Sequence, residues 1–281
     1  MSAIFSFCNQ KGGVGKTTSV VNMAALLGKK GFKVLVIDLD PQANATSGLG
    51  IEKPAKIEST VYELLVEKSE PAALIVTTEF SNVSLIPSNP DVSSVEMELY
   101  QLERREFYLK TRLETLKSKF DFIFLDCPPS LGMISINALV ASDYIVIPLQ
   151  CEYYALEGLG QLINTYQLVK TNLNPQLEIG GVILTMADSR TNLTQQVIEE
   201  VRSYFKEKVF NAIIPRSVKL SEAPSFGKPA VFYDPQNRGS KGYVDVVGEF
   251  IKKYGNKKTE EIPHTVAAVE VRVESAQNPE V

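Results

Sequence analysis

A glycine-rich segment near the beginning of the chain constrains its fold more than any other feature. The segment reads Lys11-Gly-Gly-Val-Gly-Lys16-Thr17-Thr18 and lies between an apolar run, Ala3–Cys8, and a helical pattern, Lys16–Lys30. Glycines let the backbone curl so that successive N–H groups face one anion, and the following helix adds its positive dipole end. Lys16 can reach the β- and γ-phosphates, and the Thr17 hydroxyl can ligate Mg²⁺. The sequence therefore predicts an ATP-binding phosphate loop made of Lys11, Gly12, Gly13, Val14, Gly15, Lys16, Thr17 and Thr18.

Short apolar runs that alternate with amphipathic segments predict the rest of the fold. After Ala3–Cys8, the expected strands are Lys33–Asp38, Val83–Pro87, Asp121–Asp126, Tyr144–Leu149, Ile179–Thr185 and Val209–Ile214. Runs that are apolar almost throughout are typical of strands buried on both faces, as in a parallel sheet between two layers of helices. We therefore expect an α/β fold, with a doubly wound, mostly parallel sheet and helices on both of its faces.

Longer charged segments predict further helices and a boundary near the end of the chain. The segment Asp91–Lys119 has apolar residues at helical spacing, which predicts one long helix that packs on the sheet through Val95, Leu99, Leu102, Leu109, Leu113 and Leu116. Arg238–Tyr254 is expected to be the last helix, and the composition changes after Gly255. We expect one ATPase domain over residues 1–255 and a flexible tail over residues 256–281. Val266–Glu274 alternates, so a short edge strand is the alternative for that part of the tail.

Acidic residues end two of the expected strands. Asp38 and Asp40 follow Val34-Leu-Val-Ile, and Asp126 ends the run Phe122-Ile-Phe-Leu. Open α/β sheets bind their ligands at the carboxyl ends of the strands, and residues two apart point the same way while the chain stays extended. One carboxylate of the first pair can hold a Mg²⁺-bound water while the other orients an attacking water. Asp126 is expected to meet Mg²⁺ through a water, as the acid of a Walker B strand does.

The composition limits which partners the protein can bind and in which cellular compartment we expect it. The 281 residues carry a formal charge of −4, so any contact with nucleic acid must come from a local patch and not from bulk charge. The three cysteines, Cys8, Cys127 and Cys151, lie singly in apolar runs, and we expect buried reduced thiols. No apolar stretch approaches the roughly 20 residues of a membrane span, and the apolar start lacks a positive flank. We expect a cytoplasmic protein.

The phosphate loop resembles the deviant Walker A motif of the ParA/MinD family. Gln10 stands where the standard pattern has its first glycine, and Lys11 is an additional lysine at the entry of the loop. Two further segments are similar to the ParA/Soj branch, which partitions chromosomes and plasmids: Pro148-Leu-Gln-Cys-Glu-Tyr-Tyr-Ala-Leu-Glu-Gly158 and Ile214-Pro-Arg-Ser-Val-Lys-Leu-Ser-Glu-Ala-Pro-Ser-Phe-Gly227. The resemblance covers about Met1–Tyr254, and it also identifies Asn44–Gly50 and Ser130–Gly132 with the two switch segments of the family.

This resemblance implies roles for individual residues. Lys11, Lys16 and Asp40 are the expected catalytic residues: Lys11 reaches the phosphates of a partner subunit, and Asp40 orients the attacking water. Asp38 lies near the nucleotide and its metal, whereas Thr17 and, through a water, Asp126 bind Mg²⁺. The residues that line the adenine are Pro215, Arg216 and Ser217, the last of which is usually Asn in the family.

The resemblance also implies partners. Arg190 and Lys219 match family positions that contact the backbone of duplex DNA without sequence preference, and Arg202, Lys206 and Arg216 are candidates to join them. ATP is expected to drive formation of a homodimer that associates with the nucleoid, and a ParB-type centromere-binding protein is expected to stimulate hydrolysis. The acidic segment Asp91–Glu114 is a candidate docking face for that protein.

Other members of the same superfamily define the alternatives. A MinD-like ATPase that cycles on a membrane needs a basic amphipathic helix with bulky apolar residues, and the tail after Gly255 contains no Phe, Leu or Trp. An ATPase that positions another cargo would keep the same ATP chemistry. A nitrogenase-reductase-like role needs a surface cysteine pair, whereas these cysteines lie in strand and motif positions.

Overall fold

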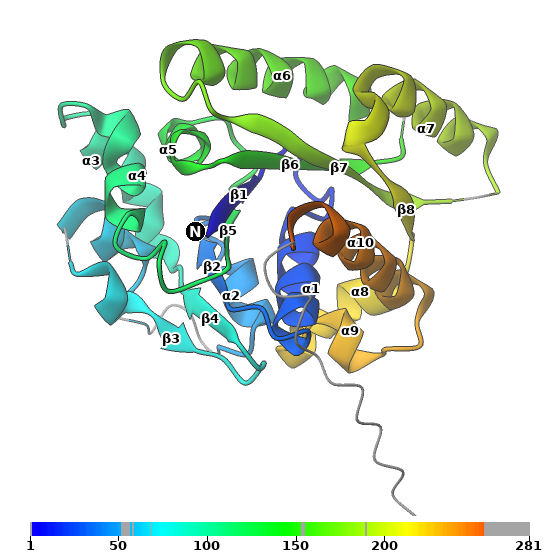
Figure 1. Ribbon diagram of the computed structural model, residues 1–281, viewed down its shortest axis with the longest axis horizontal. Helices are drawn as coiled ribbons and strands as arrows, with labels where there is room; N and C mark the ends of the chain where they lie inside the picture. Colours follow the sequence, from blue (N-terminus) through cyan, green and yellow to red (C-terminus); the bar gives the residue numbers. More distant parts are fainter. Residues whose placement is uncertain are drawn as a thin grey trace, which may run out of the picture.

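An eight-stranded sheet forms the centre of the computed structural model, in the order β3-β4-β2-β5-β1-β6-β7-β8 (Figure 1). The structure describes residues 2–51, 57, 59–67, 69–152, 155–188 and 190–255, so the predicted tail over 256–281 lies outside the described residues. Neighbouring strands run parallel, except that β3 is antiparallel to β4. The predicted doubly wound, mostly parallel α/β fold is therefore confirmed.

The strands follow the predicted apolar runs to within a few residues. Their bounds are Ala3–Phe7 (β1), Val34–Asp38 (β2), Val76–Thr77 (β3), Val83–Ile86 (β4), Phe122–Asp126 (β5), Tyr144–Gln150 (β6), Glu178–Ala187 (β7) and Val209–Pro215 (β8). Of these strands, β3 was not predicted, because two exposed residues at a sheet edge carry no hydrophobic pattern.

Helices cover both faces of the sheet. Figure 1 shows α5 (Met133–Ala141), α6 (Ala155–Asn172) and α7 (Asn192–Phe205) on one face, with α1 (Lys16–Lys29) and α10 (Arg238–Tyr254) on the other. Short helices lie around these: α2 (Asn44–Gly48), α3 (Val95–Leu99), α4 (Tyr108–Leu113), α8 (Val218–Glu222) and α9 (Ala230–Tyr233). Within the described residues, no helix combines the length and the apolar character that crossing a membrane requires.

Alternate strand residues build two separate cores. Ile4 and Cys8 point into the core beneath α5, whereas Phe5 and Phe7 point into the core shared with α1 and α10. The same period of two places Cys127 on the α5 side and Phe124 on the α1 side. Because Asp126 is two residues after Phe124, its side chain belongs to the α1 face, where the phosphate loop begins.

The prediction of one long helix over Asp91–Lys119 is wrong. The segment forms α3 and α4, separated by a turn in which Arg104 adopts a left-handed conformation with φ of 52°. Asn137 of α5 supports the interruption, since its side chain donates to the Arg105 carbonyl (2.9 Å) and accepts from the Leu109 amide (3.1 Å). The apolar positions are still buried, fully for Val95, Leu99, Leu109, Leu113 and Leu116 and partly for Leu102. Spacing along the chain therefore predicted the buried residues, but a tertiary contact shaped the backbone.

Candidate nucleotide site

The phosphate loop connects β1 directly to α1. Gly13 and Gly15 have φ of 72° and 88°, in the left-handed region that residues with a Cβ rarely adopt. Asn9 holds the entry of the loop: its Oδ1 accepts from the Lys11 amide (3.0 Å), and its Nδ2 donates to the Pro148 carbonyl (2.8 Å). Asn9 was not singled out from the sequence, although an asparagine two residues before a turn amide is a recognisable signal for such a bond.

Lys16 and Lys11 occupy opposite environments although both belong to this loop. Lys16 is 6% exposed, and its Nζ donates to the Lys11 carbonyl at 3.2 Å. Burial lowers the pKa of Lys16, while the nearby Asp126 carboxylate opposes that shift. The Lys11 side chain is 35% exposed, and its Nζ lies 3.7 Å from Glu152 Oε2. One lysine therefore faces the interior of the site, and the other lies at its rim.

Thr17 and Asp126 meet across the gap between α1 and β5. The Thr17 hydroxyl donates to Asp126 Oδ2 at 2.7 Å, and Asp126 is fully buried. Burial and the nearby Asp38 carboxylate raise the pKa of Asp126 well above its ordinary value. Among the described residues, Asp126 Oδ1 is a buried oxygen without a hydrogen-bond partner. A buried acid with one oxygen unsatisfied, beside a threonine hydroxyl, fits a hydrated magnesium ion.

Asp38 and Asp40 do not share one environment, because β2 ends at Asp38 and the chain then turns. Asp38 is fully buried, and its Oδ2 accepts from both the amide (2.8 Å) and the hydroxyl (2.7 Å) of Thr46. Burial raises the pKa of Asp38 to about 6, although these hydrogen bonds favour the ionised form. Asp40 lines the pocket beside the loop, and its Oδ1 accepts from the Gln42 amide at 2.9 Å. Asp38 therefore anchors α2, and Asp40 faces the space that a ligand would enter.

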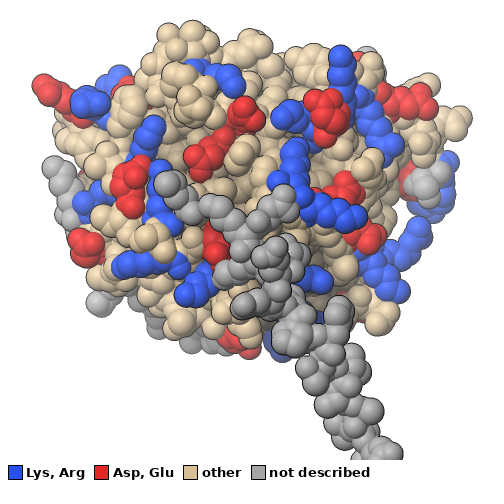
Figure 2. Space-filling view, in the orientation of Figure 1, with Lys and Arg blue, Asp and Glu red and all other residues tan. Residues whose placement is uncertain are grey.

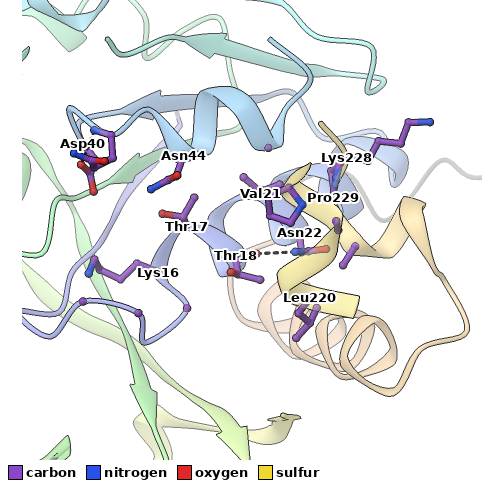
Figure 3. Close-up of a pocket in the computed structure, with 18 of the residues that line it drawn as sticks. Lys16, Thr17, Thr18, Val21, Asn22, Asp40, Asn44, Leu220, Lys228 and Pro229 are labelled. Carbon is purple, nitrogen blue, oxygen red and sulfur yellow. Dashed lines mark hydrogen bonds between the residues drawn. The ribbon is translucent and has the colours of Figure 1, made fainter. Parts of the chain in front are cut away.

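A cavity of about 340 Å³ lies next to the phosphate loop. Figure 3 shows Lys16, Thr17 and Asp40 toward one end and Val21, Leu220 and Pro229 toward the other. The polar end carries the lysine and hydroxyl expected to meet phosphates, and the opposite end is mostly apolar. The cavity thus offers a charged end and an apolar end to one ligand.

The residues predicted to line the adenine lie outside this lining. Pro215 and Arg216 line a second hollow of about 700 Å³, which Arg190 shares. The Ser217 hydroxyl donates to Asn237 Oδ1 (2.7 Å), the oxygen that also accepts from the Gly239 amide at the start of α10. Leu220, three residues beyond Ser217, does line the first cavity. The assignment of the adenine to Pro215, Arg216 and Ser217 stays a prediction.

Glu152 links the entry of the phosphate loop to the second hollow through ion pairs. It lies just after β6, and its two carboxylate oxygens face Lys11 (3.7 Å) and the Arg216 guanidinium (2.8 Å). The sequence places Glu152 in a segment that resembles the ParA/Soj branch, but it does not indicate a role, because an acid after a strand gives no signal for which cations it will contact.

Acidic residues also pair with both of the predicted DNA contacts. Arg190 donates to both oxygens of Asp188, with distances of 2.8 Å and 2.6 Å, and its side chain is 86% exposed. This guanidinium holds the pKa of Asp188 well below its usual range. Lys219 donates to Glu222 at 2.7 Å. Cations and acids are interspersed over the face seen in Figure 2, so no large area of one sign dominates the described residues on it.

The fold and the site together define a class of protein. A glycine-rich loop leads from the central strand β1 into α1, and acids end the nearby strands β2 and β5. This is the arrangement of a P-loop nucleoside triphosphatase. Consistent with that class, a family model described as an AAA domain matches residues 2–179.

Relatives narrow the class to one family. The chain is 54% identical over 249 residues to the sporulation initiation inhibitor protein Soj of Bacillus subtilis, covering 89% of this chain and 98% of the relative. It is 47% identical over 257 residues to the chromosome-partitioning ATPase Soj of Treponema pallidum, covering 92% and 100%. A solved structure of cobyrinic acid a,c-diamide synthase from Mycobacterium smegmatis with bound ADP and magnesium superposes with a TM-score of 0.80 and 34% identity, covering 91% and 96%. The chain belongs to the ParA/Soj family of chromosome-partitioning ATPases.

Proposed function

We propose that ATP binding converts this partitioning ATPase into a dimer that binds duplex DNA, and that hydrolysis reverses the change. The main support for the proposal is that two lysines of one loop differ in burial and position. Lys16 is buried at the phosphate end of the cavity, whereas Lys11 lies at the rim with a partly exposed side chain. A lysine at the rim is available to the phosphates of a second subunit, so two subunits together complete each site.

The chemistry of hydrolysis is divided among a few residues in this proposal. Lys16 would hold the β- and γ-phosphates, and the Thr17 hydroxyl and, through a water, Asp126 would hold the magnesium ion, which would neutralise phosphate charge. Asp40 orients the attacking water from its place on the cavity wall. Lys11 of the second subunit stabilises the charge that develops on the transferred phosphoryl group.

The proposed DNA surface surrounds the second hollow. Its lining includes the cations Arg190, Arg216, Arg238 and Lys241 together with the acids Asp188 and Asp245. Binding of DNA would exchange the ion pair between Arg190 and Asp188 for one between Arg190 and a phosphate. Dimerisation would double the number of such contacts, which raises affinity without any change in the contacts themselves.

The names of the relatives support partition over other uses of the same fold. Proteins named for chromosome partitioning are 47% and 49% identical to this chain, whereas the diamide synthase neighbour is 34% identical. We therefore propose that this protein acts in chromosome partition and does not catalyse the synthase reaction. A ParB-type protein as the stimulating partner and a nucleoid-associated place in the cytoplasm belong to the same proposal.

Binding of arbitrary duplex DNA tests the proposal directly. The full-length protein is measured without nucleotide, with ADP–Mg²⁺ and with ATP–Mg²⁺, at two salt concentrations, beside anionic lipid vesicles. We expect salt-sensitive DNA binding that requires ATP, and no binding to vesicles. DNA binding that is absent in all three nucleotide states, or equal in all three, contradicts the proposal.

A pair of arginine variants locates the surface. Arg190→Glu is expected to weaken ATP-dependent DNA binding by about tenfold or more, while ATP still produces a dimer. Arg104→Glu is the matched control, because Arg104 is also exposed but lies in the turn between α3 and α4. Equal losses of DNA affinity in the two variants would show that the contact is not specific to the second hollow.

A further inference from the structure

Two cysteines from different parts of the chain lie side by side directly behind the nucleotide site. Cys8 follows β1 and Cys127 follows β5, and their sulfur atoms are 3.0 Å apart. Each residue is 1% exposed and lies in the core beneath α5. The proposed hydrolysis uses neither thiol, so the pair has no role in the function described above.

The backbone around this pair suits a covalent link. The parallel ladder of β1 and β5 ends at the pair Phe7 and Asp126, so Cys8 and Cys127 are the next residues in register. The Cys127 amide donates to the Phe7 carbonyl at 3.3 Å, which holds the two segments together at this point. Adjacent strands lie about 4.8 Å apart, and disulfides span Cα separations of about 4.4 to 6.8 Å. Both side chains also point to the same face of the sheet.

A bond at this position would act on the nucleotide site through its nearest neighbours. Cys8 precedes Asn9, which holds the entry of the phosphate loop through the Lys11 amide. Cys127 follows Asp126, the acid bonded to Thr17. A disulfide has an S–S length of about 2.05 Å, so the two sulfurs must approach by about 1 Å. That approach would pull the segments that carry Asn9 and Asp126 toward each other, and sites that position reacting groups are sensitive to shifts of about 1 Å.

We propose that Cys8 and Cys127 form a disulfide when the protein meets a peroxide, and that this bond distorts the phosphate loop and lowers ATP affinity. One thiol attacks the peroxide oxygen as its thiolate, which gives a sulfenic acid and one water. The second thiol attacks that sulfur, the S–S bond forms, and a second water leaves. The two thiols lose two electrons and two protons in total, and hydrogen peroxide accepts both to become two waters. A dithiol reductant reverses the bond by exchange.

Burial controls how readily the pair reacts. Both thiols are 1% exposed, so peroxide reaches them slowly and the reaction is slow. Cys151 is similarly buried at 2% exposure, and burial raises the pKa of its thiol to about 11. Cys151 therefore provides an internal comparison, because it is also buried but follows the end of β6, several residues beyond the point where β1 pairs with that strand.

Peptide mapping after peroxide treatment tests the bond without reference to ATP turnover. The reduced full-length protein is exposed to hydrogen peroxide, its free thiols are counted, and its fragments are mapped before and after treatment with a dithiol. ATP affinity is measured on the same samples. We expect a fragment in which Cys8 is linked to Cys127, a remaining free thiol at Cys151, and an ATP affinity weaker by about tenfold or more that recovers on reduction.

Variants and a denatured control make each outcome decisive. Cys8→Ala and Cys127→Ser should each bind ATP normally and lose the response to peroxide, whereas Cys151→Ala should retain it. The denatured chain confirms that the oxidant is active. The proposal is overturned if the native protein keeps all its thiols free, if it gains single oxygen atoms without a link, or if the link leaves ATP affinity unchanged. Because mapping does not depend on DNA or dimerisation, failure of the proposed function would not mimic these results.

Discussion

Glu152 forms an ion pair with Lys11, with 3.7 Å between Oε2 and Nζ, while its other oxygen accepts from Arg216. The carboxylate therefore holds the rim lysine of the phosphate loop within its own subunit. In the proposed dimer, Lys11 must leave this acid to reach the phosphates of the second subunit. The ion pair then opposes dimerisation, although its exposure keeps the effect modest.

Glu152→Gln should strengthen the ATP-dependent dimer. Exposed ion pairs contribute about 0.2 to 1 kcal/mol, and the dimer breaks one in each subunit, so the dimerisation constant should rise by about two- to thirtyfold at low salt and less at high salt. Sedimentation of the full-length protein in ATP–Mg²⁺ measures this change, and Glu103→Gln serves as a control on an exposed acid in the turn after α3. A weaker dimer in the Glu152 variant would mean that this acid supports the interface.

Lys16→Ala should abolish productive ATP binding. Lys16 is buried at the phosphate end of the cavity, whereas the Lys11 side chain lies at the rim, so we expect a loss of ATP affinity of about a hundredfold or more. Equilibrium binding of a fluorescent ATP analogue checks the loss. Lys30→Ala removes an exposed lysine just beyond the end of α1 and should bind ATP as the parent does. Equal affinity in the parent and the Lys16 variant would remove the phosphate-loop interpretation.

Asp40→Ala should separate ATP binding from ATP hydrolysis. Asp40 lines the cavity and accepts from the Gln42 amide, so its loss should leave the contacts of Lys16 and Thr17 in place. Removing a residue that orients the attacking water typically costs about a hundredfold or more in rate. We expect slow turnover and an ATP-bound dimer that persists on gel filtration. A variant that stays monomeric in ATP would argue against this role for Asp40.

Asp38 should make folding stability depend on pH in nucleotide-free and magnesium-free buffer. Its pKa is about 6 in the folded protein, above its ordinary value of 3.8, so the folded state holds the proton more tightly than the unfolded state. The contribution of Asp38 to the free energy of unfolding should therefore be fully present below pH 3.8 and should be lost as the pH rises through 6. The total loss should be about 3 kcal/mol.

Denaturant unfolding of the parent and of Asp38→Asn over this pH range isolates the effect. The substituted amide would still accept the bonds from Thr46 through its oxygen but would carry no charge. Both proteins keep Asp126. The difference between their profiles of unfolding free energy against pH therefore measures the effect of the Asp38 charge, including its repulsion of Asp126. Parallel profiles for the two proteins would show that the buried carboxylate does not titrate in this range.

Local sequence patterns predicted some helices and strands correctly and others incorrectly. The run Phe122–Asp126 and the helix Arg238–Tyr254 were predicted closely, because a buried strand and an amphipathic helix each impose a regular hydrophobic pattern on the sequence. The segment Asp91–Lys119 carried the same kind of signal, yet Asn137 of α5 holds its backbone in a turn that spacing along the chain cannot reveal.

Residue types at fixed spacing within short segments were enough to establish the phosphate loop, the acids at the strand ends and the family. The meeting of distant groups, in contrast, was visible only after the chain had folded. Folding turned Asp38 toward Thr46 and left Asp40 on the cavity wall. It also paired Glu152 with Lys11 and brought the sulfurs of Cys8 and Cys127 within 3.0 Å. The pairings of Glu152 and of the two cysteines join segments far apart in the chain, and their geometry follows from strand order and register, which local residue patterns do not encode.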